Sequence, residues 1–203
     1  LELRILYGMY PDVINNIGQE TEVLKQLANS YLYKDILAFG GIRKPDLLEK
    51  LLQALALQIG NEVSYNELSQ LLGIDKNTVS TYIDILEKAF VVFRLKSFSK
   101  NLRNEIKTNQ KIYFCDTGIR NTVIGNFNPL NLRQDKGALW ENFLISERIK
   151  KLHYENSLAK SYFWRTVQQQ EIDYVEEEAE KIRGYEIKWS TKVKIKTPKL
   201  FTE

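Results

Sequence analysis

Four side chains in the second half of the chain are of the types that hold divalent cations and activate water. Asp173 lies between two apolar residues, Glu186 and Lys188 flank Ile187 further on, and Glu141 lies on an earlier helical stretch. Because side chains alternate along a strand, Glu186 and Lys188 are expected to share one face of a sheet. Carboxylates on one face suit Mg²⁺ or Mn²⁺, whose preferred ligands are oxygens. The spacing therefore predicts Asp173 and Glu186 as metal ligands.

The chemistry expected of this set is metal-dependent cleavage of a phosphodiester. The metal would stabilise charge on the phosphate, and Lys188 would orient an attacking water or help to deprotonate it. A second interpretation fits the same residues, because the pattern is short. Glu186 and Lys188 can form a solvated strand face, with Asp173 in a surface ion pair. The residues alone leave both interpretations open.

The elements that must position these side chains are one helix and three strands. Apolar periodicity predicts a helix over residues 137–153, which carries Glu141. Strand-like runs follow at residues 161–165, 171–175 and 182–189. The order helix, strand, strand, strand is typical of an α/β or α+β unit.

A second group of candidate residues belongs to a helix-turn-helix predicted over residues 64–90. Ser64 and Glu67 form a capping box, Gly73 supplies the left-handed position that ends the first helix, and Asp75 caps the second. The apolar face of the second helix is formed by Val79, Ile83, Leu86 and Phe90. Its polar face carries the predicted DNA-contacting side chains Lys76, Asn77, Thr78, Ser80 and Thr81. Such folds also serve as protein-interaction modules, so contact with a protein is the alternative.

A hairpin follows the helix-turn-helix and completes the pattern of a winged helix. A helix that begins at Pro45 packs behind the motif, and strands at residues 91–95 and 111–115 flank a basic loop at residues 96–107. The stretch from residue 75 to residue 111 has a larger positive excess than the whole chain, whose formal net charge is +3. Phosphate contacts from the wing are predicted for Lys96, Lys100 and Arg103.

Five stretches, taken in order, resemble a known family. They lie at residues 31–41, 65–95, 111–118, 137–147 and 163–188. Together they resemble the carboxy-terminal half of prokaryotic AAA-superfamily ATPases that carry a DUF4143 domain. The resemblance implies an amino-terminal P-loop ATPase, then a winged helix, then a unit similar to the PD-(D/E)xK nuclease fold. It places Glu141, Asp173, Glu186 and Lys188 at the nuclease-like positions.

The predicted organisation is therefore a mixed α/β chain in four parts. Residues 1–44 are a helical connector from a missing ATPase domain, residues 45–124 the winged helix, residues 125–136 a linker, and residues 137–203 a nuclease-like DUF4143 unit that is truncated. No Gly-x-x-x-x-Gly-Lys-[Ser/Thr] loop occurs in the chain, so ATP is expected only through the missing domain.

Composition narrows the setting of the protein. The single cysteine, Cys115, permits no internal disulfide, and no apolar run approaches the roughly 18 residues that a membrane span needs. We expect a cytoplasmic protein with DNA and its own ATPase domain as partners, and no membrane contact. The leading function is DNA binding by the winged helix. The alternatives are metal-dependent nuclease activity and a protein-interaction module without nucleic-acid binding.

Overall fold

The computed structural model of the protein describes residues 1–30, 36, 44–98, 110–166, 168, 170–190 and 201. Its helices are α1 (Glu2–Tyr7), α2 (Pro11–Asn15), α3 (Glu20–Leu27), α5 (Pro45–Leu57), α6 (Tyr65–Leu72), α7 (Lys76–Lys88), α9 (Thr117–Val123), the 3₁₀ turn η2 (Leu130–Leu132) and α10 (Lys136–Tyr154). Its strands are β1 (Val92–Ser97), β2 (Gln110–Phe114), β3 (Lys160–Arg165), β4 (Glu171–Glu178) and β5 (Lys181–Tyr185). The predicted mixed α/β class is confirmed.

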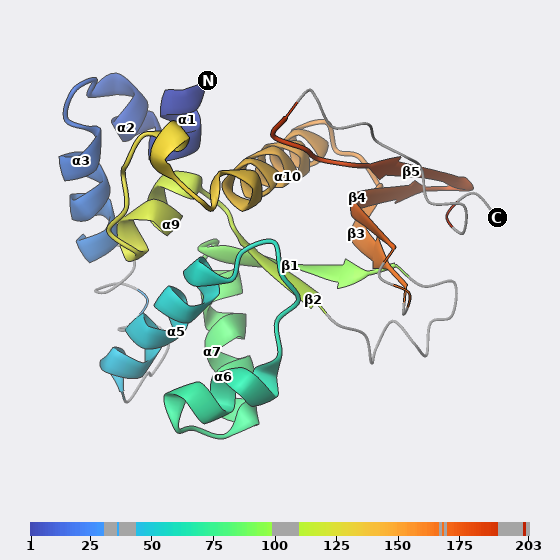
Figure 1. Ribbon diagram of the computed structural model, residues 1–203, viewed down its shortest axis with the longest axis horizontal. Coiled ribbons are helices and arrows are strands. Elements are labelled where there is room, and N and C mark those ends of the chain that lie inside the picture. The colour runs from blue at the N-terminus through green and yellow to red at the C-terminus, as the bar shows by residue number, and fades with distance from the viewer. Residues whose placement is uncertain are drawn as a thin grey trace.

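The described strands form one mixed sheet in the order β2-β1-β3-β4-β5. Neighbouring strands are antiparallel except β1 and β3, which are parallel and meet at Lys96↔Tyr162 and Ser97↔Phe163. The hairpin predicted as the base of a wing therefore shares a sheet with the three strands of the carboxy-terminal part. Figure 1 shows β1 and β2 continuing towards β3, β4 and β5.

Two apolar clusters hold the helices against one another and against this sheet. The larger cluster joins residues of α1, α2, α3, α5, α6, α7, α9 and α10 with residues of β1 and β2. The smaller one consists of Leu95, Tyr113, Ile145, Phe163 and Tyr174, and it packs α10 on β1, β2, β3 and β4. In Figure 1, α5, α6 and α7 extend to one side of the β1–β2 hairpin, and α1, α2 and α3 lie beside α9.

The caps expected for the helix-turn-helix are present. Ser64 accepts a hydrogen bond from the Glu67 N–H at 3.3 Å, and Gly73 has the left-handed φ of 64° that ends α6. The Asp75 carboxylate accepts from the N–H groups of Asn77 and Thr78, which begins α7. The expected apolar face is buried except for Phe90, whose exposed fraction is 76% because it lies beyond the end of α7 in a left-handed conformation.

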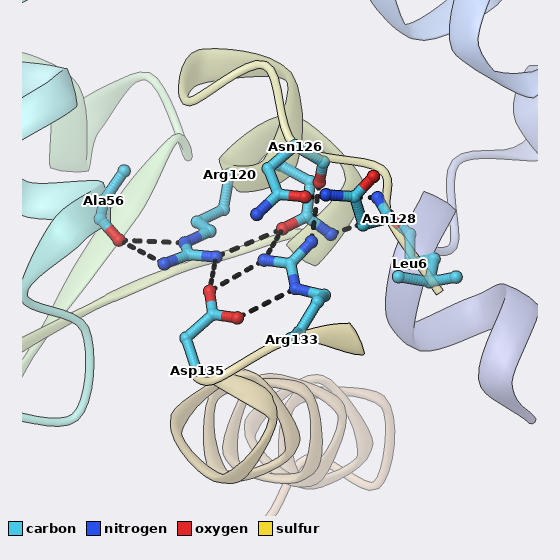
Figure 2. A network of polar contacts seen from close by, with 8 residues as sticks. Leu6, Ala56, Arg120, Asn126, Asn128, Arg133 and Asp135 are labelled. Carbon is cyan, nitrogen blue, oxygen red and sulfur yellow. Dashed lines mark hydrogen bonds and ion pairs between the residues drawn. The ribbon is translucent and has the colours of Figure 1, made fainter. Parts of the chain in front are cut away.

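The segment predicted as a linker, residues 125–136, is part of a buried polar network (Figure 2). The Arg120 guanidinium donates to the Ala56 carbonyl near the end of α5, at 2.8 and 2.7 Å. Asp135 accepts from Arg120 at 2.5 Å and from Arg133 at 2.8 and 2.7 Å. The Ala56 carbonyl is one of the last of α5, and such carbonyls need donors from outside their own helix. Through Arg120 of α9, these bonds connect the segment to both α9 and α5.

Helix α10 covers the backbone of β2, which is a terminal strand of the described sheet. The buried Asn142 amide donates to the Phe114 carbonyl at 2.7 Å and its oxygen accepts from the Phe114 N–H at 3.0 Å. This pairing satisfies the N–H and carbonyl groups of Phe114, which a strand edge would otherwise leave unpaired. It also fixes the neighbouring Glu141 against β2. Within the described ranges, no helix has the length and apolar character that crossing a membrane requires.

Candidate functional site

The residues predicted at the nuclease-like positions come together where α10, β2 and β4 meet the segment after β5. Lys188 Nζ lies 3.4 Å from Asp173 Oδ2 and 2.9 Å from Glu186 Oε1. Glu141 lies on α10, close enough for the Asp173 charge to contribute to raising its pKa, although burial contributes most. The structure therefore places all four predicted side chains in one charged cluster, which we call the carboxylate cluster.

The strand expected to carry Glu186 and Lys188 is shorter than predicted. We predicted residues 182–189 as a strand, whereas β5 ends at Tyr185. Beyond Tyr185, the Ile187 N–H donates to Asp173 Oδ2 at 2.7 Å. This N–H group therefore bonds to a side chain and not to the backbone of a neighbouring strand. Glu186 and Lys188 therefore lie beyond the end of β5, in a segment whose backbone is bonded to the Asp173 carboxylate.

Three further residues complete the carboxylate cluster, and the sequence reasoning missed them. The side chain of Lys111 is almost fully buried, with Nζ 2.5 Å from Glu171 Oε1 and 3.3 Å from Glu141 Oε1. The Tyr113 hydroxyl donates to the same Glu141 oxygen at 2.5 Å. The available signal was the alternation of Lys111 and Tyr113 on one face of an otherwise apolar strand.

The protonation of the cluster follows from its burial and its paired charges. Burial raises the pKa of Glu141, and the Lys111 charge and the Tyr113 hydrogen bond oppose this. Burial and the Glu141 charge raise the pKa of Tyr113 well above its ordinary value, so the phenol keeps its proton and donates it. Burial disfavours the ammonium of Lys111, but Glu141, Glu171 and Asp173 outweigh that effect and raise its pKa. Lys111 is therefore a buried cation at neutral pH.

The fit of a divalent metal to this cluster can be judged from the donors present. Among the residues that the structure describes, no group of three His, Cys, Asp or Glu side chains could hold a metal ion. The ammonium of Lys188 contacts both Asp173 and Glu186, which are the two predicted ligands. One Glu186 oxygen, Oε2, is buried without a hydrogen-bond partner, but a single oxygen is not a magnesium or manganese site. The described residues do not fit the metal as they stand.

The predicted DNA-contacting residues are only partly accessible. Lys76, Asn77 and Thr81 are exposed on the first turns of α7. Thr78 and Ser80 are half-buried, and the Thr78 hydroxyl donates to the carboxylate of Asp75.

The predicted wing residues can be placed only in part. Lys96 is exposed in β1. Lys100 and Arg103 lie outside the described residues, so their contacts stay predictions.

A polar groove opens beside the start of the helix-turn-helix. Its volume is about 460 Å³, and Glu62, Ser64, Asn66 and Lys76 are among the residues that line it. Lys76, the first residue of α7, therefore also lines the groove. Carboxylates and an ammonium share this lining, so the groove is of mixed charge.

Comparison with known proteins gives two family matches. A family model described as "Domain of unknown function (DUF8612)" matches residues 1–130, and one described as "Domain of unknown function (DUF4143)" matches residues 136–203. No solved structure is a significant match to the chain.

Curated relatives are longer proteins. An uncharacterized protein of Mycobacterium tuberculosis is 33% identical over 162 residues, which are 78% of this chain and 36% of that protein. An uncharacterized protein of Haemophilus influenzae is 26% identical over 185 residues, which are 87% of this chain and 42% of that protein. The chain spans less than half the length of these relatives. By the match over residues 1–130, the chain belongs to the family described as Domain of unknown function (DUF8612), and its carboxy-terminal part carries a DUF4143 match.

Proposed function

We propose that this chain binds duplex DNA and that its helix-turn-helix works as a winged helix. The order of elements supports this: α5, a short extended segment, α6, α7 and the β1–β2 hairpin follow one another. The extended segment contains Glu62, which forms an antiparallel bridge with Lys111 of β2. Three helices and a small sheet in this order are typical of winged helices, whose second motif helix enters the major groove.

The observation that carries the proposal is the exposed polar start of α7. Lys76, Asn77 and Thr81 are exposed there, and the Lys76 ammonium and the Asn77 amide are donors that phosphates and base edges accept. Negative charges further along α7 are already paired. The Arg94 guanidinium of β1 binds Asp84 at 2.5 Å and also binds Glu87. The start of α7 therefore offers donors where a duplex would approach. The acidic side chains further along the helix, Asp84 and Glu87, are paired with Arg94.

The test is a comparison of single-lysine variants in a DNA titration. Binding of a fluorescent duplex is measured by anisotropy at several salt concentrations, in EDTA so that no metal-dependent cleavage interferes. Lys76→Ala is expected to weaken binding alike for different sequences and to reduce the slope of log affinity against log salt by about 1, as the loss of one phosphate contact does. Lys151→Ala, on the exposed end of α10, is the matched control and should leave the slope unchanged.

An unchanged slope in Lys76→Ala would contradict the proposed face of α7. Binding that is absent in the unaltered chain at low salt would favour the protein-interaction module. Phosphodiester cleavage receives less support, because the described carboxylates are paired with lysines. ATP binding and a cytoplasmic location are proposals about the longer protein, and they rest on the resemblance to AAA-superfamily ATPases.

A further inference from the structure

The carboxylate cluster contains its own cations. Lys111 extends from β2 between Glu141 of α10 and Glu171 of β4, with 2.5 Å to the second and 3.3 Å to the first. Its exposed fraction is 1%, and its ammonium lies 5.4 Å from the centre of the Phe163 ring. A cation so far removed from water is retained only where carboxylates compensate it.

Lys188 pairs with the other two carboxylates of the cluster, but unlike Lys111 its side chain is exposed, at 38%. It contacts Asp173 and Glu186, so each of the four carboxylates touches one of two ammonium groups. Asp173 also accepts the Ile187 N–H, which uses another of its acceptor positions. The carboxylates that a hard divalent cation needs as ligands are therefore already paired with the two ammonium groups, and one oxygen, Glu186 Oε2, is buried without a hydrogen-bond partner.

We propose that Lys111 and Lys188 are the permanent counter-ions of the carboxylate cluster and that the cluster does not take up Mg²⁺ or Mn²⁺ in the native chain. The two ammonium groups supply the positive charge that a metal supplies in a carboxylate site. The cluster then acts as an ion-pair joint between α10, β2, β4 and the segment after β5. This inference is independent of DNA binding, which needs no metal.

Substitution of the buried lysine should convert the cluster into a cation site. Lys111→Met keeps a side chain of similar length but removes the ammonium between Glu141 and Glu171, and leaves Glu171 with the Arg165 guanidinium 3.9 Å away. Mn²⁺ should then bind to relieve the repulsion between the carboxylates, and it should raise the melting temperature of the variant by several degrees relative to EDTA. Adding Glu171→Gln should abolish that rise.

The experiment titrates Mn²⁺ into the unaltered chain and its variants by calorimetry and repeats the melts in EDTA and in Mn²⁺. The unaltered chain is expected to show no saturable heat and no metal-dependent shift. Lys150→Met, which removes a half-buried lysine of α10 paired with Glu147, outside the carboxylate cluster, is the control and should show no metal-dependent shift, like the unaltered chain.

Saturable Mn²⁺ binding by the unaltered chain that Asp173→Asn abolishes would overturn the proposal. This arm needs no Lys111 variant, so it decides the question even if Lys111→Met fails to fold. A folded Lys111→Met that gains no metal-dependent shift would also count against it.

Discussion

Asp135 stands at the start of α10 but does not cap it. Its carboxylate is instead held by Arg120 and Arg133, whose guanidinium groups are almost completely buried (Figure 2). Burial alone would raise the pKa of Asp135, yet the hydrogen bonds from Arg133 and Arg120 outweigh it and lower the pKa to about 2. One carboxylate thus compensates two buried cations, and its charge is coupled to folding.

This coupling predicts a specific acid sensitivity. Because the folded-state pKa lies below the ordinary value, the stabilisation by Asp135 is complete above about pH 4 and is lost as pH falls towards 2. Urea unfolding should give a larger free energy of unfolding for the unaltered chain than for Asp135→Asn at about pH 4 and above. This difference should narrow by about 2 kcal/mol as pH falls from about 4 towards 2.

The control for this prediction is Asp46→Asn, which changes an exposed carboxylate in the first turn of α5. Its difference from the unaltered chain should show no such narrowing. A difference between Asp135→Asn and the unaltered chain that stays constant down to pH 3 would mean that Asp135 is not the coupled group.

At the scale of single elements, helix α7 ends with ordinary hydrogen bonds but with an unusual residue, Phe90, in the left-handed position. The Val91 N–H donates to the Leu86 carbonyl and the Phe90 N–H to the Glu87 carbonyl, which together form a Schellman motif. That motif places Phe90 at a φ of 56°, where glycine is the usual residue. The ring is exposed, so little packing compensates the backbone strain.

Phe90→Gly should therefore stabilise the chain. Relief of the left-handed strain is expected to exceed the added freedom of the unfolded chain by about 1 kcal/mol, which corresponds to a rise of about 2–4 °C in melting temperature. Ala89→Gly is the matched control, since Ala89 has an ordinary φ of −85° and glycine there should lower the melting temperature. A fall for Phe90→Gly as well would show that the ring, and not the backbone, decides the stability at this position.

Elements with local signals were predictable from the sequence, and those set by distant contacts were not. Ser64, Gly73 and Asp75 mark the ends of α6 and α7 through bonds to residues at most five positions away, so their pattern predicts both helices correctly. The end of β5 depends on a bond between Ile187 and Asp173, which are far apart in the chain. Lys111 was missed for the same reason, because its partners lie on α10 and β4.

At the scale of the whole molecule, the sheet crosses the boundary that the sequence suggested between a winged helix and a nuclease-like unit. Strands β1 and β3 are separated by the helices α9 and α10, yet they pair in parallel. No local pattern encodes that pairing, since both strands are short runs in which apolar and polar residues are mixed. The network of Arg120 and Asp135 fastens the predicted linker to the same body.

The continuous sheet predicts that the chain unfolds as one unit. Scanning calorimetry should show a single transition whose calorimetric and van't Hoff enthalpies agree, because loss of β3 would leave β1 paired only with β2 among the described strands. Thermal circular dichroism followed in the far and near ultraviolet should give coincident midpoints. Two resolved transitions would instead indicate that residues 1–130 and 136–203 fold independently.

The most direct measurement of the central claim is the anisotropy of a labelled duplex titrated with the unaltered chain at several salt concentrations in EDTA. DNA binding through the exposed start of α7 predicts saturable binding that weakens steeply as salt rises, because Lys76 and its neighbours release counter-ions from phosphates. An anisotropy that stays flat even at low salt would contradict DNA binding by this chain.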